Sequence, residues 1–238
     1  MNFVLPMAGR GQRFIDAGFE VPKMLIVAKG KTLLEWSVDS LPLNLCTRMI
    51  CIVLKEHEEK FSLSEKITQI YGGRSFELVF HFLDAVTKGQ AETVWLARHL
   101  FDPNTDLLIY NIDTQFYSGT LAGKLVAKEK DGVLGGFESR ENKFSFALTG
   151  EDGYVIETTE KIPISNNALT GLYHFNTVDD FLETAQYHFD HDIRVKNEFY
   201  IAPMYNYLIQ KGKKYIVDIC EEVNILGTPE ELDNFLKK

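Results

Sequence analysis

Paired cysteines and histidine metal motifs are missing from this chain of 238 residues. Its cysteines, Cys46, Cys51 and Cys220, are odd in number and form no Cys-x-x-Cys pair. We therefore expect neither a disulfide framework nor structural zinc, and free thiols fit a reducing compartment. His188-Phe-Asp-His191 lacks the HExxH pattern, so we interpret it as an exposed helix end rather than a zinc site.

Long apolar runs and an excess of basic residues are missing as well. No apolar stretch approaches the roughly 20 residues that cross a bilayer. The apolar start of the chain is short and is broken by Gly9 and Arg10, unlike a signal peptide. Acidic residues outnumber basic ones by 34 to 25, which gives a net charge of −9, whereas nucleic acids and anionic membranes require an extended basic face. We expect a cytoplasmic protein that binds neither.

Strand-like and helix-like segments alternate in the first half of the chain. Because strands that alternate with helices form parallel sheets covered on both faces, this half predicts an α/β fold. The expected strands are Phe3–Leu5, Met49–Leu54, Glu77–Leu83 and Leu107–Ile112. The expected helices are Thr32–Leu41, a segment opened by a Ser62–Glu65 capping box, and Gln90–Phe101.

Short strand-like runs dominate after about residue 132. Glu151-Asp-Gly153 indicates a hairpin turn between two of them. The sequence predicts a Rossmann-like mixed, mostly parallel sheet with helices on both faces and a β-rich insertion, in a single domain of residues 1–238 divided near residues 131 and 132. The expected strands are Gly132–Phe137, Ser145–Leu148, Tyr154–Glu157 and Leu169–Phe175; helices are expected at Thr177–Tyr187, at Glu198–Ile209 and after Thr228, with Glu231 closing a capping box.

The first strand is followed by a glycine-rich cationic loop, "PMAGRGQRF", at residues 6–14. A dinucleotide fingerprint would need a third glycine where Phe14 stands. A Walker A loop ending at Gly30-Lys31-Thr32 would need a glycine where Leu25 stands, so neither template fits. The remaining pattern is G-x-G-x-R-F, followed about ten residues later by Pro22-Lys23.

The residues of this loop are suited to binding phosphates. Gly9 and Gly11 allow backbone amides to approach a ligand closely. Arg13 offers a planar fork that matches phosphate geometry, and Lys23 adds a compact point charge. Each cation at ~4 Å would contribute up to ~4 kcal/mol at an effective dielectric of ~20. The alternative is a surface turn with solvated arginines.

Several segments together resemble the sugar-phosphate nucleotidyltransferases, the nucleoside-diphosphate-sugar pyrophosphorylases. They are "LPMAGRGQRF…VPKMLIVAKGKTLLEWSVDSL", the helix-opening Gly89–Val94, Asn111-Ile112-Asp113, "EKIPISNNALTGLYHFN" and "LGTPEEL". The resemblance spans nearly the whole chain. It implies that an acceptor phosphate attacks the α-phosphorus of a nucleoside triphosphate and expels pyrophosphate, so that catalysis consists of positioning and charge neutralisation.

The resemblance also implies roles for individual residues. Arg13 and Lys23 would bind the triphosphate, with Lys23 at the α-phosphate, and Asp113 would hold Mg²⁺. The nucleotide would contact Ala8, Gly9, Gly11 and Gln90, and the acceptor would contact Lys161, Asn167 and Gly171. Structural alternatives remain open for three of them: Asp113 as a turn cap, Lys161 as a solvated lysine and Gln90 as an ordinary first-turn residue.

The second metal carboxylate of the family is missing from its usual place. Family members commonly supply it just ahead of the Gly-Thr-Pro turn, where this chain reads Val223-Asn224-Ile225-Leu226. Asn224 is the expected substitute ligand, and Asp218 on the preceding strand is the alternative.

Other functions remain as alternatives to transfer onto a sugar 1-phosphate. A cytidylyltransferase for a non-sugar phosphate would use the same residues. A metal-dependent glycosyltransferase would use Asn111-x-Asp113 as a D-x-D-like motif but leaves Lys23 unexplained. A non-catalytic nucleotide-sugar sensor would explain the missing carboxylate. The base, the acceptor and the number of subunits in a homo-oligomer are not legible in the sequence.

Overall fold

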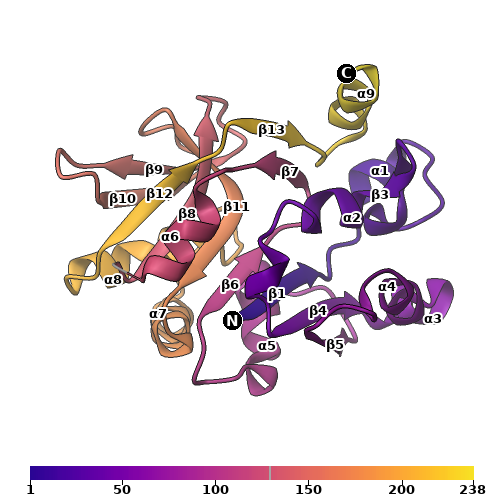
Figure 1. Cartoon of the computed structure of the whole chain (residues 1–238), viewed down its shortest axis with the longest axis horizontal. Coiled ribbons are helices and arrows are strands. Elements are labelled where there is room, and N and C mark those ends of the chain that lie inside the picture. Colours follow the sequence, from indigo (N-terminus) through magenta and orange to yellow (C-terminus); the bar gives the residue numbers. More distant parts are fainter. Residues whose placement is uncertain (129) are drawn as a thin grey trace.

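A nine-stranded mixed sheet forms the centre of the molecule (Figure 1). The structure, a computed structural model, describes residues 1–128 and 130–238. The strand order is β10-β9-β11-β6-β1-β4-β5, with β8 paired to β11 and β12 paired to β8. The strands of this sheet are β1 (Asn2–Met7), β4 (Arg48–Leu54), β5 (Glu77–Leu83), β6 (Leu107–Tyr110), β8 (Gly132–Glu138), β9 (Ser145–Thr149), β10 (Val155–Glu160), β11 (Asn167–Phe175) and β12 (Tyr215–Ile219).

Helices cover both faces of the sheet, as the α/β pattern predicts. They are α1 (Gln12–Asp16), α2 (Leu33–Val38), α3 (Lys55–Phe61), α4 (Leu63–Tyr71), α5 (Gln90–Leu96), α6 (Leu121–Ala127), α7 (Val178–Asp190), α8 (Tyr205–Gln210) and α9 (Pro229–Lys237). Short 3-10 helices occur at η1 (Lys23–Leu25), η2 (Leu43–Leu45), η3 (Arg98–Leu100) and η4 (Ala202–Met204), and short strands pair as β2 (Val27–Ala28) with β3 (Lys31–Thr32) and as β7 (Thr114–Tyr117) with β13 (Glu222–Ile225).

The first half of the sheet is parallel. β1 pairs in parallel with β4 on one side and β6 on the other, and β4 pairs in parallel with β5. All four predicted strands of this half are confirmed, although β6 ends at Tyr110 rather than Ile112. The carboxyl ends of parallel strands lie at one edge of the sheet, where open α/β sheets bind ligands.

Alternate residues of the central strands enter two separate cores. In β1, Val4 joins the cluster formed with α5, α7 and α8. Phe3 and Leu5 join the cluster formed with α2, α4 and α6 on the other face. Side chains alternate between the faces of a strand, so a doubly covered strand is apolar throughout. This explains the unbroken apolar run at the start of the chain.

The second half is mainly antiparallel and continues the same sheet. β11 pairs antiparallel with β6, β8 and β9, whereas β12 pairs in parallel with β8. The predicted hairpin at Glu151–Gly153 joins β9 to β10: Gly150 N donates to Tyr154 O at 2.8 Å, and Gly153 has φ of 79°. The β-rich character predicted after residue 132 is confirmed.

Two helix predictions are wrong in detail. The segment 198–201 is not helical; η4 starts at Ala202 and α8 at Tyr205. Glu198 instead pairs with Val195 in an isolated bridge, where Lys196 and Asn197 both have positive φ, so the chain turns back before it becomes helical. Ser62 is left-handed and makes no side-chain cap, since α3 fills the preceding segment and Glu58 binds Ser64 instead.

The end of the chain returns to the first half of the molecule. β13 runs beside β7 and leads into α9, which lies next to α1 and α2 (Figure 1). Leu232 and Phe235 of α9 pack in one cluster with Phe14 and Leu33, and Trp36 contacts Phe235 edge-on with ring centroids 5.2 Å apart. α9 therefore supports the glycine-rich loop by packing in the same cluster as Phe14.

Candidate active site

A cavity of about 650 Å³ opens at the carboxyl ends of the parallel strands. One wall is the loop after β1 with η1 and the start of α5, and the opposite wall is formed by β10, β11 and segment 198–200. Of the residues expected to bind nucleotide, acceptor or metal, the cavity wall includes Ala8, Gly9, Gly11, Arg13, Lys23, Gln90, Asp113, Lys161 and Gly171.

The glycine-rich loop is held in shape by one glycine and one aromatic anchor. Gly11 has φ of 67° and caps α1, with its carbonyl accepting from Phe14 N at 2.9 Å. Phe14 is buried in the cluster under α9. A Cβ on Gly11 would lie 3.5 Å from Cβ of Lys23, so the loop lies directly on η1. A left-handed conformation favours glycine, which explains Gly11 physically.

The two arginines of the loop have different surroundings. Arg13 is exposed and lines the cavity, and none of the described residues forms an ion pair with it. Arg10 lies outside the cavity wall and pairs with Glu56 at 3.2 Å. Only Arg13 is therefore both in the cavity and uncompensated by a nearby carboxylate in the described part of the chain.

Lys23 and Asp113 meet across the cavity floor. Lys23 Nζ lies 3.8 Å from Asp113 Oδ2, and only 15% of the Lys23 side chain is exposed. Burial lowers the pKa of Lys23, and the negative charges of Asp113 and Glu231 offset this in part. A buried ammonium gains most from an additional anion, so this position favours a phosphate.

Gln90 is tied to the strand end that carries Asp113. Its Nε2 donates to Asn111 Oδ1, and Asn111 N in turn donates to Gly171 O at 3.1 Å. Gly171 has φ of 86°, and a Cβ there would lie 2.8 Å from Asn111 Cβ. Gly171 is thus required for the close approach of β11 to Asn111, whatever else it contacts.

Gly89 lies where the two walls of the cavity are in contact. Gly89, with φ of 129°, precedes α5, and a Cβ there would lie 2.5 Å from Phe199 N. Phe199 N donates to Lys88 O at 2.7 Å, and Ala91 N donates to Phe199 O at 3.0 Å. The start of α5 and segment 198–200 are therefore connected backbone to backbone.

The wall opposite the loop carries Lys161 and a buried carboxylate. Lys161, with φ of 60°, donates from Nζ to the Tyr200 hydroxyl and lies 3.6 Å from Glu160 Oε1. Partial burial lowers the pKa of Lys161, but the hydrogen bond to Tyr200 and nearby carboxylates outweigh it, so the pKa is raised. Burial raises the pKa of Glu160, which is 5% exposed and accepts a hydrogen bond from Ser145. Lys161 is therefore held in its charged form.

Three of the expected side chains lie outside the cavity. Asn167 lies at the start of β11 opposite Glu138. The amide of Asn224 is engaged at both ends, donating to Gln115 at 2.6 Å and accepting from Lys238 at 2.6 Å.

Asp218 is buried at the far side of β12. It binds Lys124 at 2.7 Å, together with the hydroxyls of Ser118 and Thr120. Strand alternation and burial turn both side chains away, so neither Asn224, the expected metal ligand, nor Asp218, the alternative, lines the cavity.

Several polar residues of the cavity wall are not predicted as site residues by the sequence, among them Lys143, Glu198, Tyr200 and Glu231. Glu231 is the clearest case, since the Thr228-x-x-Glu231 pattern predicts a capping box. Its side chain instead binds Lys143 at 2.8 Å across the cavity mouth. Tyr200 and Glu198 fall in a segment expected to be helical. The "EFY" pattern carries no signal that separates wall residues from helix residues.

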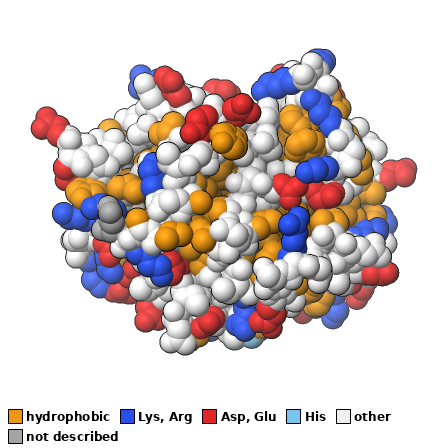
Figure 2. Space-filling view, in the orientation of Figure 1, with side chains coloured by type: hydrophobic (Ala, Val, Ile, Leu, Met, Phe, Trp, Pro, Cys, Tyr) orange, Lys and Arg blue, Asp and Glu red, His pale blue; other side chains and the backbone are white. Residues whose placement is uncertain are grey.

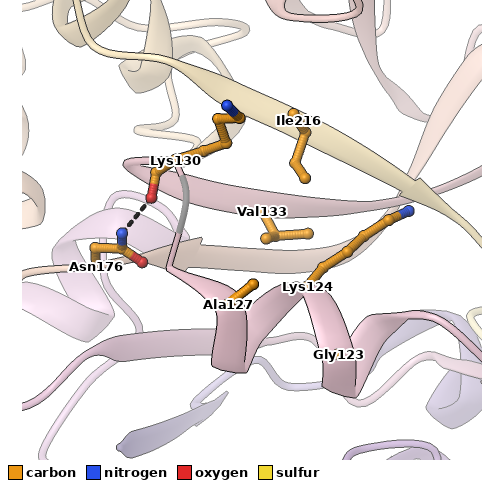
Figure 3. Close-up of a pocket in the computed structure, with 7 residues that line it drawn as sticks. All are labelled: Gly123, Lys124, Ala127, Lys130, Val133, Asn176 and Ile216. Atoms are coloured by element: carbon orange, nitrogen blue, oxygen red, sulfur yellow. Dashed lines mark hydrogen bonds between the residues drawn. The ribbon is translucent and has the colours of Figure 1, made fainter.

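A smaller cavity of about 200 Å³ lies between α6, β8 and β12 (Figure 3). Lys124 and Lys130 lie at its rim, and Asn176 donates to the Lys130 carbonyl. Lys124 is already neutralised by Asp218 at 2.7 Å. Charge compensation within the fold makes this cavity a poor phosphate site.

Other features of the described residues concern metal clusters, membrane spans and surface charge. Within residues 1–128 and 130–238, no group of three or more histidine, cysteine, aspartate or glutamate side chains is arranged to hold a metal ion. His191 contacts Tyr187 through its ring, and its Nδ1 lies 2.8 Å from the Tyr187 carbonyl oxygen. No described helix is both long and apolar enough to traverse a bilayer. On the face in Figure 2, acidic and basic side chains are interspersed without an extended basic area.

Solved structures similar to this chain agree on its fold. No protein-family model matches it, and no curated protein does. The nucleoside-diphosphate-sugar pyrophosphorylase from Vibrio cholerae RC9 is 35% identical, with a TM-score of 0.86 over 99% of this chain and 100% of that one. The inositol-1-phosphate CTP transferase from T. maritima is 18% identical, with a TM-score of 0.76 over 100% and 96%. A putative glucose-1-phosphate thymidylyltransferase from Bacillus anthracis is 16% identical, with a TM-score of 0.78 over 99% and 93%.

Fold and similarity together define the class of protein. The two more distant likenesses show the nucleotidyltransferase fold, with the mixed sheet and covering helices described above. The likeness to the Vibrio cholerae protein extends over both chains and is close enough to show the family. The chain belongs to the nucleoside-diphosphate-sugar pyrophosphorylases, which are nucleotidyltransferases.

Proposed function

We propose that the protein transfers a nucleoside monophosphate from a nucleoside triphosphate to a sugar 1-phosphate or a similar small phosphorylated acceptor. An oxygen of the acceptor phosphate forms a bond to the α-phosphorus, the bond from that phosphorus to the bridging oxygen breaks, and pyrophosphate leaves with the electron pair. The name of the Vibrio cholerae relative supports a nucleoside-diphosphate sugar as the product. No covalent protein intermediate is needed.

One observation carries the proposal: cations face each other across a single cavity. Lys23 and Arg13 lie on the loop wall, and Lys161 lies on the opposite wall. Two anionic substrates repel each other, and fixed cations on both sides lower this cost without reorganisation. Lys23 would stabilise charge at the α-phosphate, and Lys161 would hold the acceptor phosphate.

The bases of nucleotides would lie over the start of α5. Gln90, fixed by Asn111, lines the same cavity as Ala8, Gly9 and Gly11 of the loop. A side-chain amide and backbone groups can each pair with a base edge. We assign these residues to nucleotide binding, and we assign Gly171 to the part of the cavity that the acceptor contacts.

The cavity floor also suits Mg²⁺. Asp113 Oδ2 faces the cavity close to Lys23, and a carboxylate together with phosphate oxygens is the donor set that Mg²⁺ prefers. Asp113 would hold the ion, which when bound would supply charge neutralisation on the triphosphate. Residues 1–238 would act as one domain in the cytoplasm, with nucleotide contacts mainly before residue 132.

The test is pyrophosphate release from wild-type protein in a matrix of four nucleoside triphosphates against a panel of phosphorylated small molecules, with Mg²⁺. We expect release with one base and an acceptor of one class. Lys23→Ala should lower kcat by about 100- to 1000-fold, as the loss of a transition-state charge contact does elsewhere. No pyrophosphate with any pair would refute the proposal, as would a Lys23→Ala variant with the wild-type rate.

A further inference from the structure

The strand next to Asp113 brings no second carboxylate into the cavity. β13 pairs with β7 so that Ile225 lies opposite Thr114, and Leu226 N donates to Asp113 O at 2.7 Å. Ile225 lines the cavity, whereas its neighbour Asn224 faces away. The position beside Asp113 on this strand is therefore apolar.

The next element of the chain, α9, carries Glu231, whose carboxylate does not bind the backbone N of Thr228 as its capping pattern predicts. Glu231 is the third residue of α9, and its backbone N donates the capping hydrogen bond to Thr228 Oγ1 at 3.2 Å. In α2 the same pattern is completed, because Glu35 Oε2 accepts from Thr32 N at 2.8 Å. In α9 no such return bond from Glu231 is formed within the described chain. Glu231 is turned into the cavity instead.

Glu231 and Asp113 approach one common point above Gly227. A Cβ on Gly227 would lie 3.2 Å from Glu231 Oε2 and 3.7 Å from Asp113 Oδ2. Glu231 Oε1 is held by Lys143 at 2.8 Å, whereas Oε2 accepts no hydrogen bond from any residue the structure describes. The side chain is only 15% exposed. Lys143 thus orients the Glu231 carboxylate, and its Oε2 lies on the side of Asp113. Gly227 has no side chain, which leaves the space beside these two oxygens open.

We propose that Glu231 is the second carboxylate that faces the metal ion of the metal–triphosphate complex, supplied by the first turn of α9 rather than by β13. The inference rests on the proposed function. Two carboxylates and the triphosphate oxygens form the hard oxygen set that Mg²⁺ or Mn²⁺ takes. Lys143 orients Glu231 from the opposite wall, as outer partners orient metal ligands in other proteins.

The experiment measures metal binding without turnover. Mn²⁺ bound to the full chain is measured by equilibrium dialysis, first with Mn²⁺ alone and then with Mn²⁺ and inorganic tripolyphosphate. We expect Glu231→Gln and Asp113→Asn each to weaken Mn²⁺–tripolyphosphate binding about tenfold or more. The adjacent, exposed Glu230→Gln is the matched control and should bind as wild type does.

A rescue variant separates loss of the ligand from loss of structure. Ile225→Asp in the Glu231→Gln background restores a carboxylate beside Asp113 and should recover most of the lost affinity. Equal Mn²⁺ affinity in Glu231→Gln and Glu230→Gln overturns the inference. A wild-type protein that binds neither Mn²⁺ alone nor Mn²⁺ with tripolyphosphate also overturns it. Pyrophosphate release by wild type tests the proposed function separately.

Discussion

Charged side chains in this protein differ in whether an opposite charge already lies beside them. Arg10 and Arg13 are three residues apart on one loop, yet Arg10 pairs with Glu56, whereas Arg13 faces the cavity. The fold therefore leaves Arg13 available for an anionic ligand. Exposed ion pairs contribute little to stability, so we expect the pair with Glu56 to add little to folding.

Replacing these two arginines should affect nucleotide binding unequally. We expect Arg13→Ala to raise the KM for the triphosphate about tenfold or more, because a charge-assisted contact to phosphate contributes about 1.5–3 kcal/mol. Arg10→Ala should leave KM within about twofold of wild type. The check is initial-rate kinetics with the preferred triphosphate, and similar values for both variants would contradict the assignment of Arg13.

A buried histidine predicts how stability depends on pH. His174 Nε2 lies 3.2 Å from Asp106 Oδ2, and its Nδ1 has no hydrogen-bond partner among the described residues. Burial lowers the pKa of His174 below its usual 6.5, and the contact with Asp106 offsets this in part. The unfolded state therefore binds the proton first, and stability should fall as pH drops through about 6.5.

The measurement is urea unfolding at pH 8 and pH 5.5. His174→Gln retains an N–H donor for Asp106 but cannot titrate, so the loss of stability between the two pH values should be smaller than in wild type. Asp106 has a lowered pKa, and its contribution should persist until the pH falls below about 4, outside this interval. An unchanged pH dependence in His174→Gln would exclude His174 as its source.

Whole elements are positioned by close backbone contacts that only glycine permits. The start of α5 touches segment 198–200 at Gly89, where a Cβ would lie 2.5 and 2.6 Å from N and O of Phe199. These atoms belong to backbone that is hydrogen-bonded to Lys88 and Ala91, so they cannot move independently. The start of α5, where we propose that the base binds, and the wall that carries Lys161, where we propose that the acceptor binds, are fixed relative to each other here.

Gly89→Ala should therefore disturb both stability and catalysis. We expect a loss of about 1–3 kcal/mol in unfolding free energy from backbone strain and displacement, with KM raised for both substrates. Gly153→Ala is the control: it also has positive φ but open space around it, and it should change stability without changing KM. Urea unfolding and two-substrate kinetics would test this, and an effect on one KM alone would contradict it.

The elements were more predictable than the directions of their side chains. β5 was bounded correctly at Glu77–Leu83 because its apolar run and flanking turns are local signals. Thr32–Glu35 and Thr228–Glu231 share one capping pattern, yet only the first is closed, because Lys143 draws the second glutamate away. Asn224 was assigned to the metal site, but the alternation of β13 turns its neighbour Ile225 inward. Pairing register and distant partners decide such choices, and neither is visible locally.

At the scale of the whole molecule, both tryptophans connect the two halves. Trp36 of α2 contacts Phe235 of α9, and Trp95 of α5 contacts Phe189 of α7, with ring centroids 5.2 and 5.5 Å apart. The central sheet also runs without interruption from β5 to β10. Separating the halves would therefore expose both indoles and break the pairing of β6 with β11.

We expect one cooperative unfolding transition for residues 1–238. Tryptophan fluorescence and far-UV circular dichroism should give superimposable urea curves, because no half retains its core without the other. The predicted division near residue 131 would then mark a change of role within one domain. A fluorescence transition that precedes the loss of helix and sheet signal would instead show that the halves separate first.

The contact between Gly89 and Phe199 has a consequence for how specificity can change. A mutation that reshapes segment 198–200 for a bulkier acceptor would push directly on the residue before Gln90. Evolution or engineering would then find the choice of acceptor and the choice of base hard to alter one at a time. Libraries that randomise both positions together should yield new substrate pairs more often than libraries that vary either alone.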